Sequence, residues 1–141
     1  MFKTGMLLRR YSVQKGGCVR ALVVDDSSAM RAVLRLLLKQ CGFEVIEEAR
    51  HGKDAITALI RTGPLELALV DWNMPEMSGL ELLQAIRSKH EFDAMKVMMV
   101  TTETDMEQVK KALGGGADEY LMKPFNKESV AEKLRLLGFQ G

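Results

Sequence analysis

Histidine and cysteine are scarce in this chain, and their spacing forms no metal-binding or thiol-redox motif. The 141 residues include two cysteines, Cys18 and Cys41, and two histidines, His51 and His90. There is no C-x-x-C pair, and the histidines lie far apart in sequence and outside apolar strands, which gives little support to a zinc site or a Ser-His-Asp triad. We therefore expect free thiols in a reducing cytoplasm.

The chain also lacks a strong charge bias and a long apolar run. Its formal net charge is +1, so its overall charge predicts no attraction to nucleic acid or membranes. No apolar stretch approaches the roughly 20 residues that a transmembrane helix needs. A length of 141 residues, with 47% hydrophobic and 28% charged residues, indicates one soluble globular domain.

No acidic residue precedes Asp25, and the start of the chain is basic. The basic side chains here are Lys3, Arg9, Arg10, Lys15 and Arg20. The apolar stretch 6–8 is shorter than the roughly 7–15-residue core of a secretory signal, and Gly16-Gly17 is typical of a flexible join. We predict a basic, flexible extension over residues 1–18, in which Met6 is another candidate start. A docking arm for an acidic partner is the alternative.

From residue 19 onward, short apolar runs alternate with segments of helical periodicity. Strands are predicted at 19–24, 43–48, 65–70, 96–101 and 117–122. Helices are predicted to start near Ser27 or Ser28, Gly52, Ser78, Thr104 and Asn126. The first helix carries an inward stripe of Met30, Val33, Leu34, Leu37, Leu38 and Cys41. Thr104 and Glu107 have the spacing of a capping box at the start of the fourth helix.

Five strand–helix units predict an α/β fold, a flavodoxin-like doubly wound sheet of five parallel strands with five helices. The strands at 43–48 and 117–122 carry charges, which edge strands tolerate, whereas the other three are apolar and suit the interior. This pattern favours the order 2-1-3-4-5. The domain is predicted to span residues 19–138, with a short tail at 139–141 and no output domain attached.

Acidic residues follow two strands that are neighbours in this order. Asp25 and Asp26 follow the first strand, and Asp71 follows the third. Three carboxylates that meet at one sheet edge repel one another unless a cation lies among them or one is protonated. Ligands of such sheets bind at this same edge, where the strand order reverses. The sequence therefore predicts a cation site there.

Two further groups are predicted at this edge, the hydroxyl of Thr101 and the ammonium of Lys123. Hard oxygen ligands suit Mg²⁺, which commonly works together with a phosphate. A lysine and a hydroxyl opposite the metal would hold the remaining phosphoryl oxygens, which indicates phosphoryl transfer by positioning and charge stabilisation. Asp71 is the expected acceptor because it stands alone at the centre of the sheet, and Asp25 and Asp26 are the expected metal ligands.

Five stretches carry a resemblance to a known family. They are Leu22-Val23-Val24-Asp25-Asp26, Asp71-Trp72-Asn73-Met74-Pro75, Ser78-Gly79-Leu80-Glu81-Leu82-Leu83, Met99-Val100-Thr101 and Lys123-Pro124-Phe125. Between residues 19 and 138 the chain resembles the receiver domains of response regulators, and especially the CheY-like, single-domain chemotaxis regulators. The resemblance implies that Asp71 accepts a phosphoryl group from a histidine kinase. It also implies that Asp26 binds Mg²⁺ directly, Asp25 directly or through water, and that Asp71 and the backbone carbonyl of Asn73 complete the ligands.

The resemblance further implies how such a site would act as a switch. Thr101 would move to hydrogen-bond the phosphoryl group, Lys123 would pair with it, and Tyr120 would then turn inward. Asn73 and Glu103 would flank the attacking water and tune dephosphorylation, and this pair resembles that of regulators that switch off quickly. The peptide bond between Lys123 and Pro124 would be cis.

Output is expected through binding to a downstream protein, such as a flagellar switch component. The candidate output surface consists of Met106, Val109, Lys110, Tyr120, Lys127 and Lys133, although plain helix packing explains Met106 and Val109 equally well. The other expected partners are a histidine kinase and a phosphatase, with no nucleic acid, no membrane insertion, and a monomer or a weak phosphorylation-dependent dimer.

Other functions remain open at this point. One is a stand-alone receiver in another two-component pathway or phosphorelay, and another is a receiver that only binds, against which the intact set of site residues argues. A magnesium-dependent aspartyl phosphohydrolase would typically carry an acid at Asn73 and would need a substrate pocket or cap domain. A flavin-binding protein would need a phosphate-cradling loop after the first strand, where Asp25 and Asp26 would repel phosphate.

Overall fold

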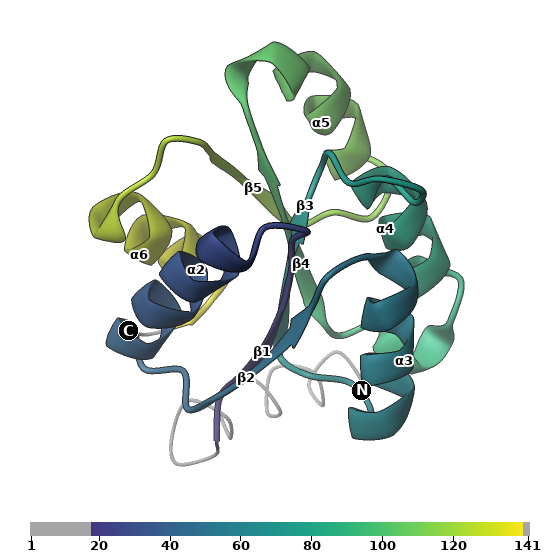
Figure 1. Ribbon diagram of the computed structural model, residues 1–141, viewed down its shortest axis with the longest axis horizontal. Coiled ribbons are helices and arrows are strands. Elements are labelled where there is room, and N and C mark those ends of the chain that lie inside the picture. Colours follow the sequence, from purple (N-terminus) through teal and green to yellow (C-terminus); the bar gives the residue numbers. More distant parts are fainter. Residues whose placement is uncertain (1–17, 140–141) are drawn as a thin grey trace, which may run out of the picture.

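A parallel sheet of five strands forms the centre of the computed structural model, which describes residues 18–139 (Figure 1). The strands are β1 (Arg20–Val24), β2 (Val45–Ala49), β3 (Leu67–Asp71), β4 (Lys96–Thr101) and β5 (Glu119–Met122). Their order is β2-β1-β3-β4-β5, and all neighbours are parallel. The predicted flavodoxin-like order is therefore confirmed.

Helices cover both faces of this sheet within the described residues. They are α2 (Ser28–Gln40), α3 (Gly52–Thr62), α4 (Gly79–Arg87), α5 (Met106–Leu113) and α6 (Lys127–Leu136), with two 3₁₀ turns, η1 (His90–Phe92) and η2 (Glu103–Asp105). Figure 1 shows α2 and α6 on one face and α3, α4 and α5 on the other. None of these helices has the length and apolar character required to cross a membrane.

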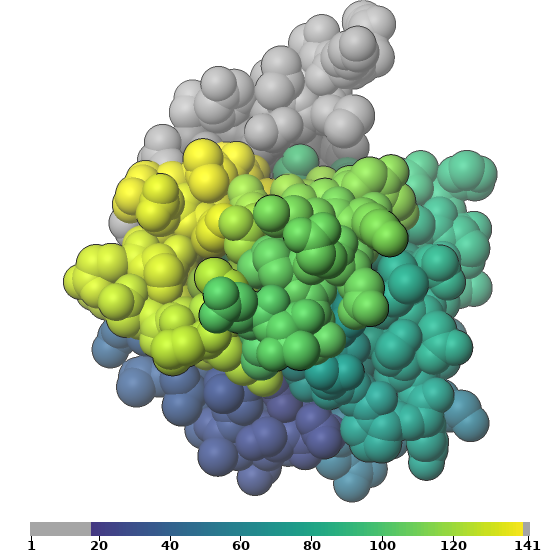
Figure 2. All heavy atoms as spheres, turned by 90° about the horizontal axis from the view of Figure 1, so that it is seen from above, coloured from purple at the N-terminus to yellow at the C-terminus, as the bar shows by residue number. Residues whose placement is uncertain are grey.

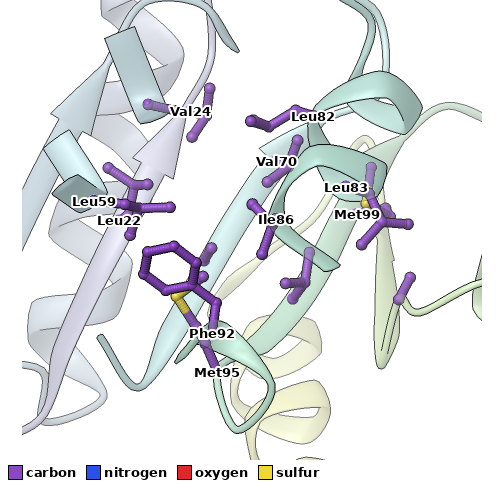
Figure 3. Close-up of a cluster of buried hydrophobic side chains, with 14 of the residues drawn as sticks. Leu22, Val24, Leu59, Val70, Leu82, Leu83, Ile86, Phe92, Met95 and Met99 are labelled. Carbon is purple, nitrogen blue, oxygen red and sulfur yellow. The ribbon is translucent and has the colours of Figure 1, made fainter. Parts of the chain in front are cut away.

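Two apolar cores lie on the two sides of the sheet. Alternate residues of one strand point to opposite faces, so β1 contributes Leu22 to one core and Val23 to the other. Figure 3 shows the core beneath α3 and α4, where strand residues meet Leu59, Leu82 and Ile86. Burial on both faces explains why β1 and β3 are apolar throughout, since each fully buried leucine contributes about 1.5–3 kcal/mol.

Side-chain caps start four of the five α-helices between residues 18 and 139. The capping residues are Ser27 of α2, His51 of α3, Ser78 of α4 and Asn126 of α6. Each side chain accepts a hydrogen bond from a first-turn N–H that would otherwise lack a partner. The starts predicted near Ser27, Ser78 and Asn126 are thus confirmed.

The start predicted for α5 was wrong. This helix begins at Met106 rather than at Thr104, and its N-cap residue Asp105 makes no side-chain cap hydrogen bond. Residues 103–105 form the 3₁₀ turn η2, so Thr104 lies inside a turn instead of at the extended position that a capping box requires.

Other boundaries also differ from prediction. β2, β3 and β5 each start two residues later than predicted, because the residues before them make single main-chain hydrogen bonds instead of a ladder. Val33 was predicted to face inward, but it is 46% exposed, so the buried stripe of α2 is narrower. Phe139 was assigned to a tail, whereas it packs against Phe43 in the core, with 5.3 Å between ring centroids. The predicted extension at residues 1–17 lies outside the described residues.

Candidate functional site

The pairing of β1 with β3 brings the predicted carboxylates together. Val24 pairs with Val70, so the residues that follow, Asp25 and Asp71, lie at the same sheet edge. One carboxylate oxygen from each of Asp25, Asp26 and Asp71 lies within 4.8 Å of the others. Asp25 and Asp71 are buried and Asp26 is exposed, so the cluster is open to solvent on one side.

Asp25 offers a specific indication of a cation. Its Oδ1 accepts a hydrogen bond from the N–H of Ser27 at 2.9 Å, whereas its buried Oδ2 has no hydrogen-bond partner. A buried carboxylate oxygen without a partner is costly. An oxygen-only donor set that includes such an atom fits a hard divalent cation such as Mg²⁺.

Lys123 brings a positive charge to the buried part of the cluster. It follows β5, and its Nζ lies 3.4 Å from Asp71 Oδ1 and 3.9 Å from Asp25 Oδ2. The peptide bond between Lys123 and Pro124 is cis, as the family resemblance implied. The lysine is half-buried, so its ammonium can contact the carboxylates and also a ligand that enters from solvent.

Burial changes the acidity of the two inner carboxyls. It raises the pKa of Asp71 to about 6, and the neighbouring charge of Asp25 adds to this effect, whereas Lys123 opposes it. Burial likewise raises the pKa of Asp25. The protein part of the site therefore resists full ionisation, and a bound cation would reverse this effect by favouring the charged carboxylates.

Thr101 ends β4 next to β3, where Val100 pairs with Asp71. Its side chain is buried, and its hydroxyl donates to the carbonyl oxygen of Thr102 at 3.3 Å. This is a long hydrogen bond for a hydroxyl donor. Thr101 is thus positioned at the sheet edge with a hydroxyl that can be redirected at little cost.

Gly79 has a role at the site that the sequence did not reveal. It starts α4 directly behind Asp71, and its N–H donates to the carbonyl oxygen of Trp72 at 3.0 Å. A Cβ at this position would collide with the carbonyl oxygen of Asp71. A glycine directly after the N-cap Ser78 is the sequence signal for this close approach.

Asn73 and Asp105 form a second contact that sequence analysis missed. Asn73 Nδ2 donates to Asp105 Oδ2 at 2.8 Å across 32 residues of sequence. This bond joins the loop after Asp71 to η2, which also holds the exposed Glu103. Nothing in the local spacing indicates it, because it depends on the packing of two loops.

The candidate output surface lies mainly on α5, β5 and α6. Figure 2 shows α5 in bright green and α6 in yellow on one face of the molecule. Lys110 and Lys127 are exposed, and Met106, Tyr120 and Lys133 are partly exposed. The prediction that Val109 belongs to this surface was wrong, because its side chain is fully buried in the core beneath α5.

Tyr120 is held by a neighbouring helix. The ammonium of Lys133, on α6, lies 3.9 Å from the centroid of the Tyr120 ring and 3.2 Å from Glu119 Oε1. A cation over an aromatic face is attractive, typically by about 0.5–1 kcal/mol at exposed sites. Lys133 therefore links the ring position to α6.

Comparison with known proteins gives a consistent result. Residues 21–135 match the family model described as the response regulator receiver domain. The chain is 40% identical over 116 residues to a chemotaxis protein CheY homolog of Campylobacter jejuni, covering 82% of this chain and 89% of the relative. It is 39% identical over 119 residues to the chemotaxis protein CheY1 of Helicobacter pylori, covering 84% and 96%. Among solved structures, the chemotaxis protein CheY4 of Vibrio cholerae matches with a TM-score of 0.75 and 32% identity, covering 84% of this chain and 97% of that one.

Proposed function

This chain belongs to the response-regulator receiver family, and we propose that it is a chemotaxis-type switch that accepts a phosphoryl group on Asp71. Members of this family act as signalling switches rather than as conventional enzymes. The observation that carries the proposal is the cluster of three carboxylates within 4.8 Å, with Lys123 beside Asp71 and an unpartnered oxygen on Asp25.

The cofactor that fits this donor set is Mg²⁺. Asp25, Asp26, Asp71 and the backbone carbonyl of Asn73 would hold it. When bound, it would neutralise the carboxylate charges and bind a phosphoryl oxygen of the incoming donor. The buried Oδ2 of Asp25 supports this assignment, because a cation would give that oxygen a partner.

Asp71 supplies the nucleophile. One of its carboxylate oxygens bonds to the phosphorus of a phosphohistidine on a kinase, the P–N bond breaks, and the departing imidazole recovers a proton. The product is an acyl phosphate. Lys123 balances the negative charge of the phosphoryl group, and the Thr101 hydroxyl donates a hydrogen bond to it. The long hydrogen bond of Thr101 to Thr102 supports this role, since little is lost when the hydroxyl turns.

The phosphoryl group then changes the output surface. It adds about 1.5–2 negative charges beside Thr101, and the movement of Thr101 lets Tyr120 turn inward beneath α5. Because Lys133 contacts the Tyr120 ring, this motion also changes α6. Lysines at positions 110, 127 and 133 favour a target with acidic side chains, such as a flagellar switch component or a phosphatase. Self-association, if present, would be a weak phosphorylation-dependent dimer.

The sole tryptophan gives a direct test. Trp72 is adjacent to Asp71 and is 8% exposed, so its fluorescence should report changes at the cluster. We would add Mg²⁺ and then acetyl phosphate, following fluorescence and intact mass together. A magnesium-dependent fluorescence change and a gain of one phosphoryl group, absent in Asp71→Asn, are expected. If Asp71→Asn takes up the same label, the acceptor lies elsewhere.

A second step identifies the pathway. Purified histidine kinases of the chemotaxis type and of other two-component pathways would be compared as donors to the same protein. Faster transfer from the chemotaxis kinase is expected, because the listed similarity to chemotaxis proteins covers most of the chain. Preferential transfer from another kinase would instead support a stand-alone receiver of another pathway or a phosphorelay.

A further inference from the structure

The N-terminus of α5 differs from that of the other described helices. Asp105 occupies its N-cap position and belongs to a residue type that caps helices well. Its carboxylate nevertheless makes no bond to a first-turn N–H of α5. The N–H groups of Glu107 and Gln108, which an N-cap side chain normally satisfies, therefore lack that partner.

The carboxylate of Asp105 is already engaged with the carboxylate-cluster loop. Its Oδ2 accepts the hydrogen bond from Asn73 Nδ2 at 2.8 Å. Asn73 lies two residues after Asp71. One short bond thus connects the loop beside the cluster with the first turn of α5.

The backbone of Asp105 is arranged for this contact and not for capping. Its φ and ψ angles are −97° and 7°, whereas the capping residues Ser78 and Asn126 have ψ values of 164° and −178°. A capping conformation would require ψ of Asp105 to rotate into the extended range. Because Asp105 is the last residue of η2, this rotation would open that 3₁₀ turn. The two uses of Asp105 therefore exclude each other.

We propose that Asp105 is a positioning residue that alternates between Asn73 and the N-terminus of α5, and that occupation of the carboxylate cluster selects the capped state. This inference rests on the proposed function, since it takes the cluster to be the Mg²⁺ and phosphoryl site. When the main chain of Asn73 turns towards a cation, its side-chain amide moves away from Asp105. The released carboxylate then caps α5.

The two states are close enough in energy for such control. A cap hydrogen bond and an exposed side-chain hydrogen bond contribute comparable free energies, so a small displacement of Asn73 changes the preference. Linkage makes the effect reciprocal. If cation binding breaks the bond between Asn73 and Asp105, then removing that bond beforehand must tighten cation binding.

Three substitutions separate the states. Asp105→Ser provides a short side chain that caps well but is too short to keep the contact with Asn73. Asp105→Ala allows neither interaction. Glu107→Gln is the matched control, because it removes an exposed acidic charge in the same turn and leaves the bond to Asn73 in place. Loss of acidic charge alone weakens attraction for Mg²⁺, which is the direction opposite to the proposal.

The experiment combines Mg²⁺ titration, followed through Trp72 fluorescence and calorimetry, with amide exchange at Glu107 and Gln108. In the unmodified protein, Mg²⁺ should slow exchange at these amides by roughly fivefold. Asp105→Ser should show slow exchange with or without Mg²⁺, and Asp105→Ala fast exchange in both. Both variants should bind Mg²⁺ several-fold more tightly than the unmodified protein, and Glu107→Gln should not.

The outcomes distinguish this inference from the function on which it rests. If Mg²⁺ binds but exchange at Glu107 and Gln108 stays constant, or both Asp105 variants bind more weakly, the Asp105 inference is wrong and the receiver site stands. If neither fluorescence nor calorimetry detects Mg²⁺ binding to the folded protein, the proposed function fails, and the inference with it.

Discussion

Lys123 Nζ lies 3.4 Å from Asp71 Oδ1, although 52 residues separate them in the chain. This contact joins the end of β5 to the end of β3, with β4 between them in the sheet. It places a fixed positive charge beside the carboxylate that we propose as the phosphoryl acceptor. The same charge competes with any cation that enters the cluster, so Lys123 has two opposing effects that can be measured separately.

Replacement of Lys123 by alanine should separate these effects. Mg²⁺ should bind several-fold more tightly, because a competing cation is gone, while phosphorylation by acetyl phosphate should slow by roughly 10²-fold, because the developing charge loses a partner. Lys127→Ala, which removes an exposed charge on α6, serves as the control and should change neither rate nor affinity appreciably. Equal phosphorylation rates in Lys123→Ala and the control would remove Lys123 from the chemistry.

The raised pKa of Asp71 predicts how stability depends on pH without divalent cations. Because the folded pKa, about 6, lies above that of an unfolded aspartate, the folded state retains this proton over a range where the unfolded state has lost it. The contribution is fully present below about pH 4 and is lost as the pH rises through about 6, a total on the order of 2–3 kcal/mol. Urea unfolding in EDTA from pH 4 to 8 measures it.

Asp71→Asn provides the matching control for the pH series. Its free energy of unfolding should fall less between pH 4 and 6, and at pH 7.5 without Mg²⁺ it should be more stable than the unmodified protein. The raised pKa of Asp25 leaves a residual slope. Identical pH profiles for the two proteins would show that the proton is not held on Asp71.

The close approach of α4 to Asp71 predicts that Gly79→Ala destabilises the domain. The added Cβ would collide with backbone at Asp71 and Trp72, which can yield only by moving the strand end, at a cost of roughly 1–3 kcal/mol. Gly115→Ala is the comparison, because a Cβ there meets its nearest neighbour at an ordinary 3.6 Å. Its effect should stay within about 0.5 kcal/mol. Thermal unfolding of both variants measures the difference.

Arg87 is predicted to be a main polar support beneath α5. Its guanidinium donates to the carbonyl oxygens of Phe92, Met95 and Gly116 and to the carboxylate of Asp118. Arg87→Ala leaves these partly buried acceptors without a partner and should cost roughly 2–4 kcal/mol in urea unfolding. Removal of Arg61, whose ion pair with Glu47 is largely exposed on the arginine side, should cost about 1 kcal/mol or less. Similar losses for both arginines would contradict this assignment.

The residues that flank the site predict a short-lived phosphorylated state. Asn73 and Glu103 are both exposed, so water reaches the acyl phosphate between them. Glu103→Lys, which places a larger cation beside the attacking water, should lengthen the phosphoryl lifetime several-fold, and Glu107→Lys one turn further on should not. Decay of the phosphorylated protein, followed by intact mass, checks both. A lifetime of many hours in the unmodified protein would be the opposite result.

The order of the strands and the grouping of the three aspartates were readable from sequence. Apolar runs that alternate with helical periodicity specify five strand–helix units, and the charges in β2 and β5 indicate which strands lie at the edges. In a parallel sheet all strands end at one edge, so residues that follow strands meet there. This reasoning needs only the position of each residue along its own element, which is why Asp25, Asp26 and Asp71 could be placed together.

Contacts between loops required the tertiary structure. The bond between Asn73 and Asp105 and the burial of Val109 depend on how α5 lies on the sheet, and no local periodicity encodes that placement. The start of α5 was mispredicted for the same reason, since the carboxylate of Asp105 is drawn to Asn73 instead of to its own helix. Sequence specifies the elements because hydrogen bonding and apolar patterning are local, whereas long-range packing decides which of two competing partners a side chain takes.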